Sequence, residues 1–346
     1  MPIPRTEEVG NPSALAIDAD DLVLHQLPLT YRRRKTFAQA FASRVNQMAE
    51  LLGAGPFDPT AGADLAAPLH EMGYARAGSL LSSDQVKDLL AYFADRPCFN
   101  AHVVARSDQV ESRPDDLAGR SHFGSYRAHD VICAPHILEL ANNPRILDAV
   151  GNYLGCVPSL YSMNAWWSFP RPEFGTGITQ NFHRDGDDYK NCVLFLYLTD
   201  TFADGCHEYI RYSHDPDGLS HNMGRRGRFT VEIADGEKIA VSEGLDELFE
   251  GTGYGRDDIY HTLFNELVEP ITGAAGDGFF TDPDGLHRAT HPMHKRRLIV
   301  WLRYGMHRNC AYVRDLIQPL DRACVAGRLP DTPHARFVNR LVVSPD

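Results

Sequence analysis

The sequence lacks the patterns that mark several protein classes. Its seven cysteines are scattered and odd in number, and no two of them form a Cys-x-x-Cys pair, which argues against a zinc-finger site and a disulfide framework. The first residues show no basic segment followed by an apolar one. No apolar run reaches the roughly 18 residues that a membrane helix needs. We therefore expect reduced thiols, no secretory signal, no membrane span and a cytoplasmic location.

Positive charge is also scarce. The chain has 34 Lys and Arg against 46 Asp and Glu, a formal net charge of −12. This balance argues against nucleic-acid and membrane partners, which attract basic surfaces. The 346 residues, 43% hydrophobic and 23% charged, suit a globular protein with one large core or two small ones. The sequence does not predict an oligomeric state.

Residues 1–66 are interpreted as an N-terminal extension with one helix, and residues 67–346 as a single domain. A basic patch at 32–35 opens the helix, which is predicted to run to about Leu52. Its apolar residues recur at helical spacing, at Phe37, Phe41, Val45, Met48 and Leu52. Residues 53–66 are rich in Gly, Ala and Pro and are interpreted as a linker.

Helices are predicted next. Ser82 and Gln85 stand at the spacing of a capping box, which predicts a helix through Phe93. The stretch from 135 to 154 is predicted to be helical, with a break and restart at Asn143-Pro144, because proline fits the first turn of a helix.

Beyond residue 158 the pattern changes to short strands, predicted at 161–169, 192–198, 229–233, 238–241, 278–282 and 298–304. Helices followed by many short strands predict a mainly β fold with a helical flank: an antiparallel jelly-roll type of sandwich at about 158–306. Residues 215–275 are interpreted as an insertion between strands that could act as a lid. They include an acidic segment near 243–250.

The most informative stretch is Gln180–Asp185, followed about a hundred residues later by His287. His183 and Asp185 are two residues apart, so in an extended chain they point to the same side. In a chain with 16 histidines one such triplet is expected by chance, and its surroundings have to carry the argument. Two histidines and one carboxylate leave three open positions on iron(II) for oxygen and a chelating cosubstrate.

An arginine follows at a useful place. Arg297 begins an apolar strand ten residues after His287, and its planar fork matches a carboxylate. On the alternation of that strand it shares a face with Ile299 and Trp301, so we prefer it to the neighbouring Arg296 as the anchor of 2-oxoglutarate.

Several motifs extend this pattern: Gly73-Tyr74 with Leu80–Ser82, Gln180–Asp185, Leu194–Asp200, Asp204-Gly205 leading to Tyr212–His214, Gly276–Phe280, Gly285–Ala289 and Arg297. In these segments, from about 73 to 304, the chain resembles the phytanoyl-CoA dioxygenase family of iron(II)/2-oxoglutarate oxygenases. The resemblance implies a double-stranded β-helix (jelly-roll) core. It also implies His183, Asp185 and His287 as iron ligands and Arg297 as the cosubstrate anchor, with Asn164 and Tyr197 as further cosubstrate contacts.

The chain departs from the family pattern at two places. Tyr212 stands where the family usually has glycine. Ala289 stands where a serine often helps to hold the cosubstrate, with Thr290 next. Related halogenases lack the carboxylate ligand, so the presence of Asp185 favours hydroxylation or a related oxidation.

The expected function is therefore a non-heme iron(II)/2-oxoglutarate dioxygenase that uses O2. It would oxidise an unactivated C–H bond of a small metabolite or biosynthetic intermediate and release succinate and CO2. An anionic substrate group is one option, because arginines occur at 225, 226 and 228. Two alternatives stay open: a metal-dependent jelly-roll hydrolase or isomerase without 2-oxoglutarate, and a non-catalytic jelly-roll binding protein.

Further expectations concern other polar and aromatic residues. His207, His291 and His294 are expected at the surface or behind the metal ligands, and His214 in a structural turn. Asp187 and Asp188 are interpreted as solvated turn residues in preference to support for the metal. Trp166 and Trp167 should point to opposite faces, one into the core and one towards a substrate pocket.

Overall fold

The computed structural model describes residues 31–100, 111–170, 180–185, 187–202, 204–222, 229–232, 238–241, 260, 263–306 and 320–344. The arginines at 225, 226 and 228 and the acidic segment near 243–250 lie outside the described residues. No described helix combines the length and the apolar character that crossing a bilayer requires.

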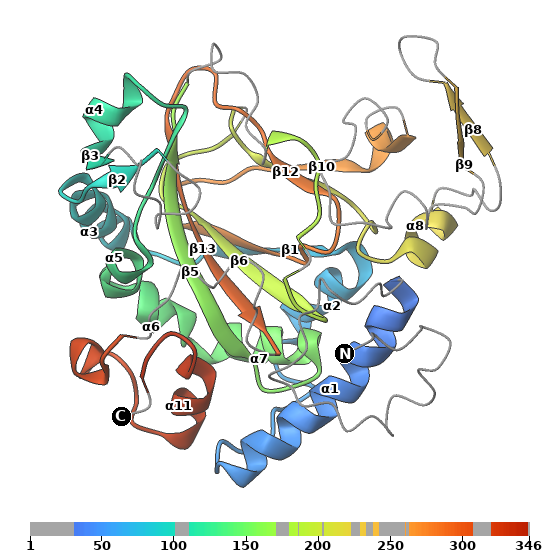
Figure 1. Cartoon of the computed structure of the whole chain (residues 1–346), viewed down its shortest axis with the longest axis horizontal. Coiled ribbons are helices and arrows are strands. Elements are labelled where there is room, and N and C mark those ends of the chain that lie inside the picture. The colour runs from blue at the N-terminus through green and yellow to red at the C-terminus, as the bar shows by residue number, and fades with distance from the viewer. Residues whose placement is uncertain are drawn as a thin grey trace, which may run out of the picture.

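Helices precede the main strands, as predicted, and others follow (Figure 1). They are α1 (Tyr31–Leu51), α2 (Ala63–Met72), α3 (Ser83–Ala94), α4 (Pro114–Ala118), α5 (Ala128–Cys133), α6 (Ile137–Ala141), α7 (Pro144–Leu154), α8 (Pro216–Asn222) and α11 (Pro333–Asn339). The predicted capping box is confirmed: the Ser82 hydroxyl accepts from the Gln85 N–H at 3.3 Å, and the Ser82 N–H donates to Gln85 Oε1 at 2.9 Å. Asn143 caps α7, which confirms the restart.

The linker prediction for residues 53–66 was wrong at its end, because α2 begins at Ala63. The alanine-rich composition hid an apolar face: Leu65, Ala66 and Leu69 are buried, and α2 packs against α7. Burial of that face stabilises a helix that composition alone does not predict.

The strands form two facing antiparallel sheets and a separate hairpin. The large sheet has the order β1-β11-β6-β13-β5-β4-β2-β3 and the small sheet the order β10-β7-β12. Their bounds are β1 (Tyr74–Ser79), β2 (Cys98–Phe99), β3 (Glu111–Ser112), β4 (Phe123–Ser125), β5 (Ser159–Ser168), β6 (Asn191–Tyr197), β7 (His207–Ile210), β10 (Val268–Ile271), β11 (Asp277–Thr281), β12 (His287–Ala289) and β13 (Arg297–Gly305). β5, β6, β7 and β10–β13 build the predicted double-stranded β-helix.

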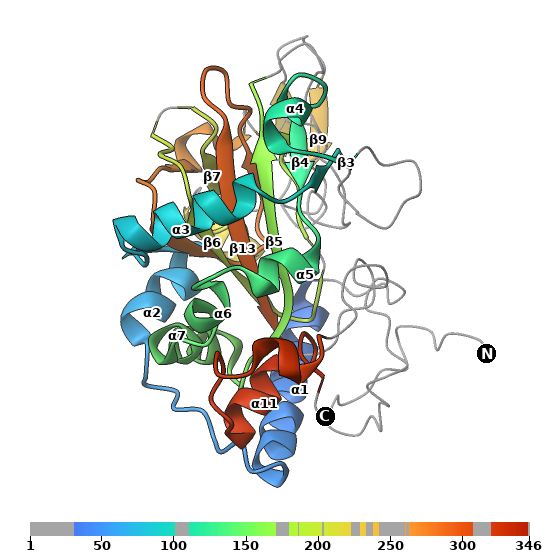
Figure 2. The same cartoon turned by 90° about the vertical axis from the view of Figure 1, so that its left-hand side faces the viewer.

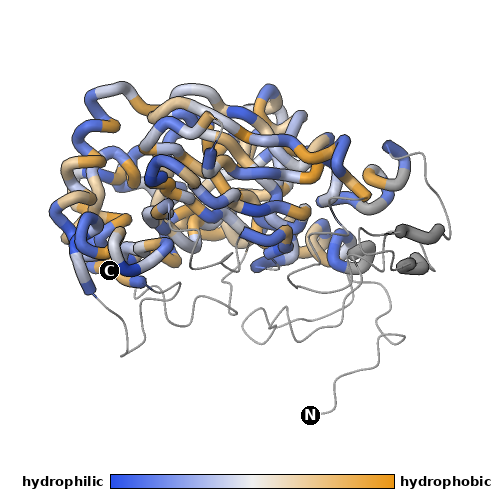
Figure 3. The backbone as a smooth tube through the Cα atoms, turned by 90° about the horizontal axis from the view of Figure 1, so that it is seen from above, coloured by the Kyte–Doolittle hydropathy of each residue, from blue (hydrophilic) through white to orange (hydrophobic). Residues whose placement is uncertain are grey.

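The large sheet has two differently covered faces, because side chains alternate along each strand. On β13, Leu298, Val300 and Leu302 belong to the core beneath the helices, whereas Ile299 and Trp301 face the small sheet. Helices cover the first face (Figure 2). Hydrophobic and hydrophilic positions are interspersed along the backbone of the body (Figure 3). The second face is therefore the interior of the jelly roll, and the small sheet closes it.

The insertion between strands, predicted at 215–275, ends earlier than predicted, because its last residues belong to the small sheet. The two strands predicted near its centre are present as β8 (Phe229–Glu232) and β9 (Lys238–Val241), which pair with each other as an antiparallel hairpin. Residues 268–271, however, form β10, which pairs with β7 over its whole length. Four residues with a proline give too weak a period for recognition as a strand.

Helix α1 is integrated with the rest of the described structure. Its apolar residues Phe37, Ala42 and Val45 belong to the same hydrophobic core as the outer face of the large sheet. Arg34 donates to Asp284 at 2.8 Å. The boundary at residue 66 stays a prediction, and α1 shares its core with residues on the C-terminal side of that boundary.

Candidate metal centre

Backbone hydrogen bonds bring the two predicted histidine ligands together. His183 and His287 form an antiparallel bridge in which each N–H donates to the carbonyl of the other at 3.0 Å. The N–H of Asp185 donates to the carbonyl of Pro283 at 2.8 Å. The two segments, about a hundred residues apart in the sequence, are thus fixed side by side, with His183 bridged to strand β12 of the small sheet.

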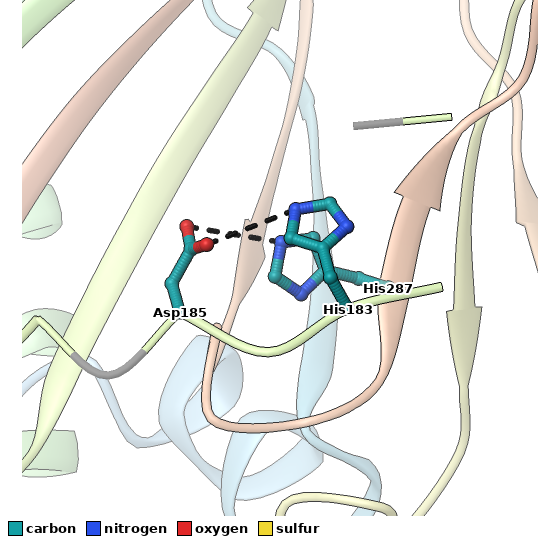
Figure 4. A group of neighbouring side chains, drawn as sticks. All are labelled: His183, Asp185 and His287. Atoms are coloured by element: carbon teal, nitrogen blue, oxygen red, sulfur yellow. Dashed lines mark ion pairs between the residues drawn. The ribbon is translucent and has the colours of Figure 1, made fainter. Parts of the chain in front are cut away.

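The three side chains converge, as Figure 4 shows. One ligand atom from each of His183, Asp185 and His287 lies within 4.8 Å of the other two. The Asp185 carboxylate lies 3.7 Å from His183 Nε2 and 3.9 Å from His287 Nε2. This arrangement of two imidazoles and one carboxylate can hold a divalent transition metal with open positions opposite the protein.

The other ring nitrogen of each histidine is held by the backbone. His183 Nδ1 lies 2.8 Å from the carbonyl of Asn181, and His287 Nδ1 lies 2.9 Å from that of Gly285. An Nδ1–H that donates to a carbonyl leaves Nε2 free to ligate a metal, and it fixes the ring. Gly285 is required here, since a Cβ would approach the Tyr209 hydroxyl to 1.8 Å.

The carboxylate of Asp185 is oriented by Arg303, which the sequence analysis missed. Arg303 Nη2 donates to Asp185 Oδ2 at 3.1 Å. Burial alone favours the neutral carboxyl, but Arg303 and the two histidines outweigh it and lower the pKa of Asp185 to about 2. Burial beside His183 lowers the pKa of His287 to about 4. At neutral pH both groups are therefore in the forms that ligate a metal.

Asp187 and Asp188 are buried, so their interpretation as solvated turn residues was wrong. Asp187 accepts from Arg303 and from the Tyr161 hydroxyl. Asp188 accepts the N–H of Met306 at 2.7 Å. Turn-like composition hid these partners, which come from distant strands. Asp187 supports the metal centre because it holds the guanidinium that contacts Asp185.

Arg297 lies on the interior face of β13 together with Ile299 and Trp301, in agreement with the alternation of the sequence. Its guanidinium donates to the carbonyl of Gly205 and, at 3.0 Å, to the hydroxyl of Ser168. It is 3% exposed, and its Nε has no partner among the described residues. Burial lowers its pKa. Arg296, the competitor, is instead paired with Asp115 near the surface.

Asn164 and Tyr197 occupy positions on the large sheet. Asn164 is half-buried on β5, opposite Trp301, and accepts from the Ser162 hydroxyl at 2.7 Å. Tyr197 is fully buried; its hydroxyl donates to the carbonyl of Ile271 at 2.7 Å and accepts the N–H of His207 at 2.9 Å. The Tyr197 hydroxyl thus joins β6 to the small sheet, and cosubstrate contact by either residue stays a prediction.

The interior is lined with aromatic rings. Trp166 packs edge-on against Trp301 at a centroid distance of 4.8 Å, whereas Trp167 is buried in the core beneath the helices. The two tryptophans therefore point to opposite faces as predicted. Phe195 and Phe279 stack at 5.1 Å on the interior face.

His207 is in the interior beside a metal ligand, which agrees with the second of its two expected positions and not with the surface. It is 3% exposed, its ring stacks on that of His287, and its Nε2 has no partner in the described structure. Burial holds its pKa well below the usual value. The four-residue strand β7 is too short to predict this inward direction from the sequence. His214, the predicted structural histidine, is buried in a turn and bonds to the carbonyl of His70 at 3.0 Å.

No protein-family model and no curated protein matches the sequence. Solved structures do show a remote likeness. The non-heme alpha-ketoglutarate-dependent epimerase SnoN from nogalamycin biosynthesis is 16% identical with a TM-score of 0.46, over 75% of this chain and 90% of that one.

EvdO2 from Micromonospora carbonacea var. aurantiaca, complexed with 2-oxoglutarate, is 14% identical with a TM-score of 0.44, over 73% of this chain and 94% of that one. HygX from Streptomyces hygroscopicus, with nickel and 2-oxoglutarate bound, is 12% identical with a TM-score of 0.43, over 70% of this chain and 85% of that one. At such identities the function of this chain has to be inferred from its own residues.

Proposed function

We propose that this protein is an iron(II)- and 2-oxoglutarate-dependent oxygenase of the phytanoyl-CoA dioxygenase family. The proposal has it hydroxylate, or otherwise oxidise, an unactivated C–H bond of a small-molecule substrate, with release of succinate and CO2. The observation that carries it is the convergence of His183, Asp185 and His287 in a jelly roll whose interior also holds a buried, incompletely bonded Arg297.

The donor set fits iron(II). Two imidazole nitrogens and one carboxylate oxygen suit a first-row divalent metal and leave one side of it open. Asp185 is kept ionised by Arg303, so that its charge is available to the ion. When bound, iron and 2-oxoglutarate would supply the oxidising chemistry, which no side chain can supply.

The interior also fits a dicarboxylic cosubstrate. Among the described residues, the hydrogen-bond partners of Arg297 are neutral: the Gly205 carbonyl and the Ser168 hydroxyl. A buried guanidinium is stabilised by an anion, and a carboxylate matches its geometry. The rings of Trp166, Trp301 and Phe195 line the same interior face of the sheet, and apolar surroundings strengthen such an attraction.

The partner proposed for the site is a small molecule. An anionic group on it, cytoplasmic location and the absence of nucleic-acid and membrane partners stay predictions from the sequence. Within the described residues the aromatic lining favours a substrate with apolar surface.

The test is calorimetric titration of 2-oxoglutarate into protein loaded anaerobically with iron(II) or manganese(II). We expect binding that depends on both the metal and Arg297. A metal-loaded protein that does not bind 2-oxoglutarate would refute the proposal. It would favour a metal-dependent hydrolase or isomerase.

Two variants sharpen the test. His183→Ala should abolish metal retention, as measured by metal analysis of the purified protein. Arg296→Met is the matched control for Arg297→Met, because Arg296 pairs with Asp115 near the surface, and it should leave binding of 2-oxoglutarate unchanged. A chain that holds no metal and loses nothing with His183→Ala would instead be a binding protein.

A further inference from the structure

We propose that His207 is a cosubstrate-positioning residue whose Nε2–H donates a hydrogen bond to a carboxylate oxygen of the bound 2-oxoglutarate. This inference deepens the proposed function and rests on it. It concerns a histidine that neither ligates the metal in the arrangement described above nor bonds through Nε2 to any described residue.

The first observation is the position of His207 in the small sheet. β7 and β12 are antiparallel, with His207 opposite Ala289 and Tyr209 opposite His287. Ala289 is two residues from His287, so positions 287 and 289 face the same side. His207 therefore points into the interior beside a residue that has no polar side-chain atom.

The second observation is the packing of the ring. The imidazole of His207 lies 5.4 Å from that of His287, with 16° between the ring planes. Phe195 and Phe279 hold its other sides at 4.7 and 5.3 Å. Three rings thus fix the orientation of His207, and its Nε2 makes no hydrogen bond to any of them.

The third observation is the proximity of Arg297. Its Nη1 donates to the carbonyl of Gly205, two residues before His207. His207 hence lies on the path from the metal ligand His287 to the guanidinium. A 2-oxoglutarate held both by the metal ligands and by Arg297 would therefore lie beside His207.

A buried polar nitrogen without a partner is costly, and proteins rarely keep one without use. The carboxylates of 2-oxoglutarate only accept hydrogen bonds, so the chemistry selects the tautomer of His207 that carries its proton on Nε2. The hydrogen bond that results would be charge-assisted and stronger than one between neutral groups.

The experiment measures the dissociation constants of manganese(II) and of 2-oxoglutarate, by anaerobic calorimetry, for the wild type and three variants. His207→Phe keeps a flat ring and removes the donor. It should weaken 2-oxoglutarate about 10- to 100-fold while the affinity for manganese stays within about threefold. His207→Gln restores a donor and should recover most of the loss.

His214→Gln is the control, because it removes another buried imidazole, one that bonds to the carbonyl of His70. It should leave both constants unchanged. Unchanged 2-oxoglutarate affinity in His207→Phe would overturn the inference. Loss of manganese binding in that variant would overturn it too, and would make His207 a ligand. Failure of the metal-loaded wild type to bind 2-oxoglutarate would instead refute the proposed function.

A readout on the unaltered protein covers the case in which the variants do not fold. In zinc-loaded protein with 15N-labelled histidine, addition of 2-oxoglutarate should give the His207 Nε2 a slowly exchanging proton. A spectrum in which only the ligand histidines respond would contradict the hydrogen bond.

Discussion

Arg297 and Arg303 lie on the same face of β13, near its two ends, in very different surroundings. Arg303 is neutralised by two carboxylates, those of Asp185 and Asp187. Arg297 has no carboxylate within 4.0 Å among the described residues, and its hydrogen bonds go to neutral oxygens. Burial disfavours both cations, but the carboxylates raise the pKa of Arg303, whereas the pKa of Arg297 falls.

The difference separates two uses of a buried cation. The charge of Arg303 is balanced within the fold by two carboxylates, and the residue orients the proposed metal ligand Asp185. In the proposed function, the charge of Arg297 is available to the carboxylate of the cosubstrate. A buried cation without a counter-ion costs stability, which function can justify.

The largest expected effect follows removal of the paired arginine. Arg303→Met leaves Asp185 and Asp187 buried without their cation, so the free energy of unfolding should fall by about 3–5 kcal/mol. Urea unfolding of the metal-free protein measures it. Adding Asp187→Asn should recover part of the loss. Equal stability of Arg303→Met and wild type would contradict a structural role for the pair.

Removal of Arg297 should have little effect on stability and a large effect on cosubstrate binding. Arg297→Met leaves no carboxylate of the described residues unpaired, so stability should stay within about 1 kcal/mol of the wild type or rise. Affinity for 2-oxoglutarate should fall about 100-fold or more, because a buried charge pair is lost. Unfolding and calorimetry on one preparation test both statements. A variant that unfolds readily, with unchanged affinity, would reverse the comparison.

The stability difference between the wild type and Arg303→Met should depend on pH. In the wild type the folded pKa of Asp185, about 2, lies below its unfolded value. Its contribution is therefore present above the unfolded pKa and lost as pH falls towards 2. In Arg303→Met burial raises the folded pKa of both carboxyls, so protonation stabilises that variant as pH falls.

The stability gap between the wild type and Arg303→Met should therefore narrow by about 1–2 kcal/mol between pH 7 and pH 4. Unfolding curves at each pH measure it. The corresponding stability gap for Arg297→Met should not change, because no carboxylate in the described part of the chain pairs with that residue. A constant gap for both variants would mean that Asp185 and Asp187 do not depend on Arg303.

The smallest effect concerns a neutral partner of Arg297. Ser168 accepts from Nη2 at 3.0 Å, and Ser168→Ala removes one hydrogen bond that orients the guanidinium. We expect 2-oxoglutarate to bind less than tenfold more weakly with metal affinity unchanged. A loss as large as that of Arg297→Met would place Ser168 itself in contact with the cosubstrate.

The same strand shows what sequence reasoning can reach. β13 and β6 were predicted because each is a continuous apolar run. Arg297 was placed on the face of Ile299 and Trp301 because successive side chains of a strand point to opposite sides. Arg303 lies on the same face near the other end of the strand. From the sequence an arginine there would be expected in solvent, because the burial of its partner Asp187 is not apparent. Burial of a charged residue depends on partners far away in the sequence, which a single sequence does not reveal.

Short elements were missed for a related reason. β7, β10 and β12 have three or four residues each, fewer than a period-2 pattern needs. His207 was therefore not recognised as inward-pointing. The ligand motif was recognised because His183 and Asp185 lie two residues apart, whereas the backbone bridge that brings His287 to them forms only in the folded sheet.

The central place of β13 also has a consequence for the order of folding during synthesis. β13 pairs with both β5 and β6, but it is the last strand of the sheet to leave the ribosome. Until it emerges, β5 and β6 each lack a neighbour and expose edges that other chains can join. Chains truncated before residue 297 should therefore aggregate, whereas chains that end after β13 can close the sheet. The proposed metal and cosubstrate site therefore forms late, because β13 carries both Arg297 and Arg303. Iron would bind to a complete site only after β13 has been synthesised.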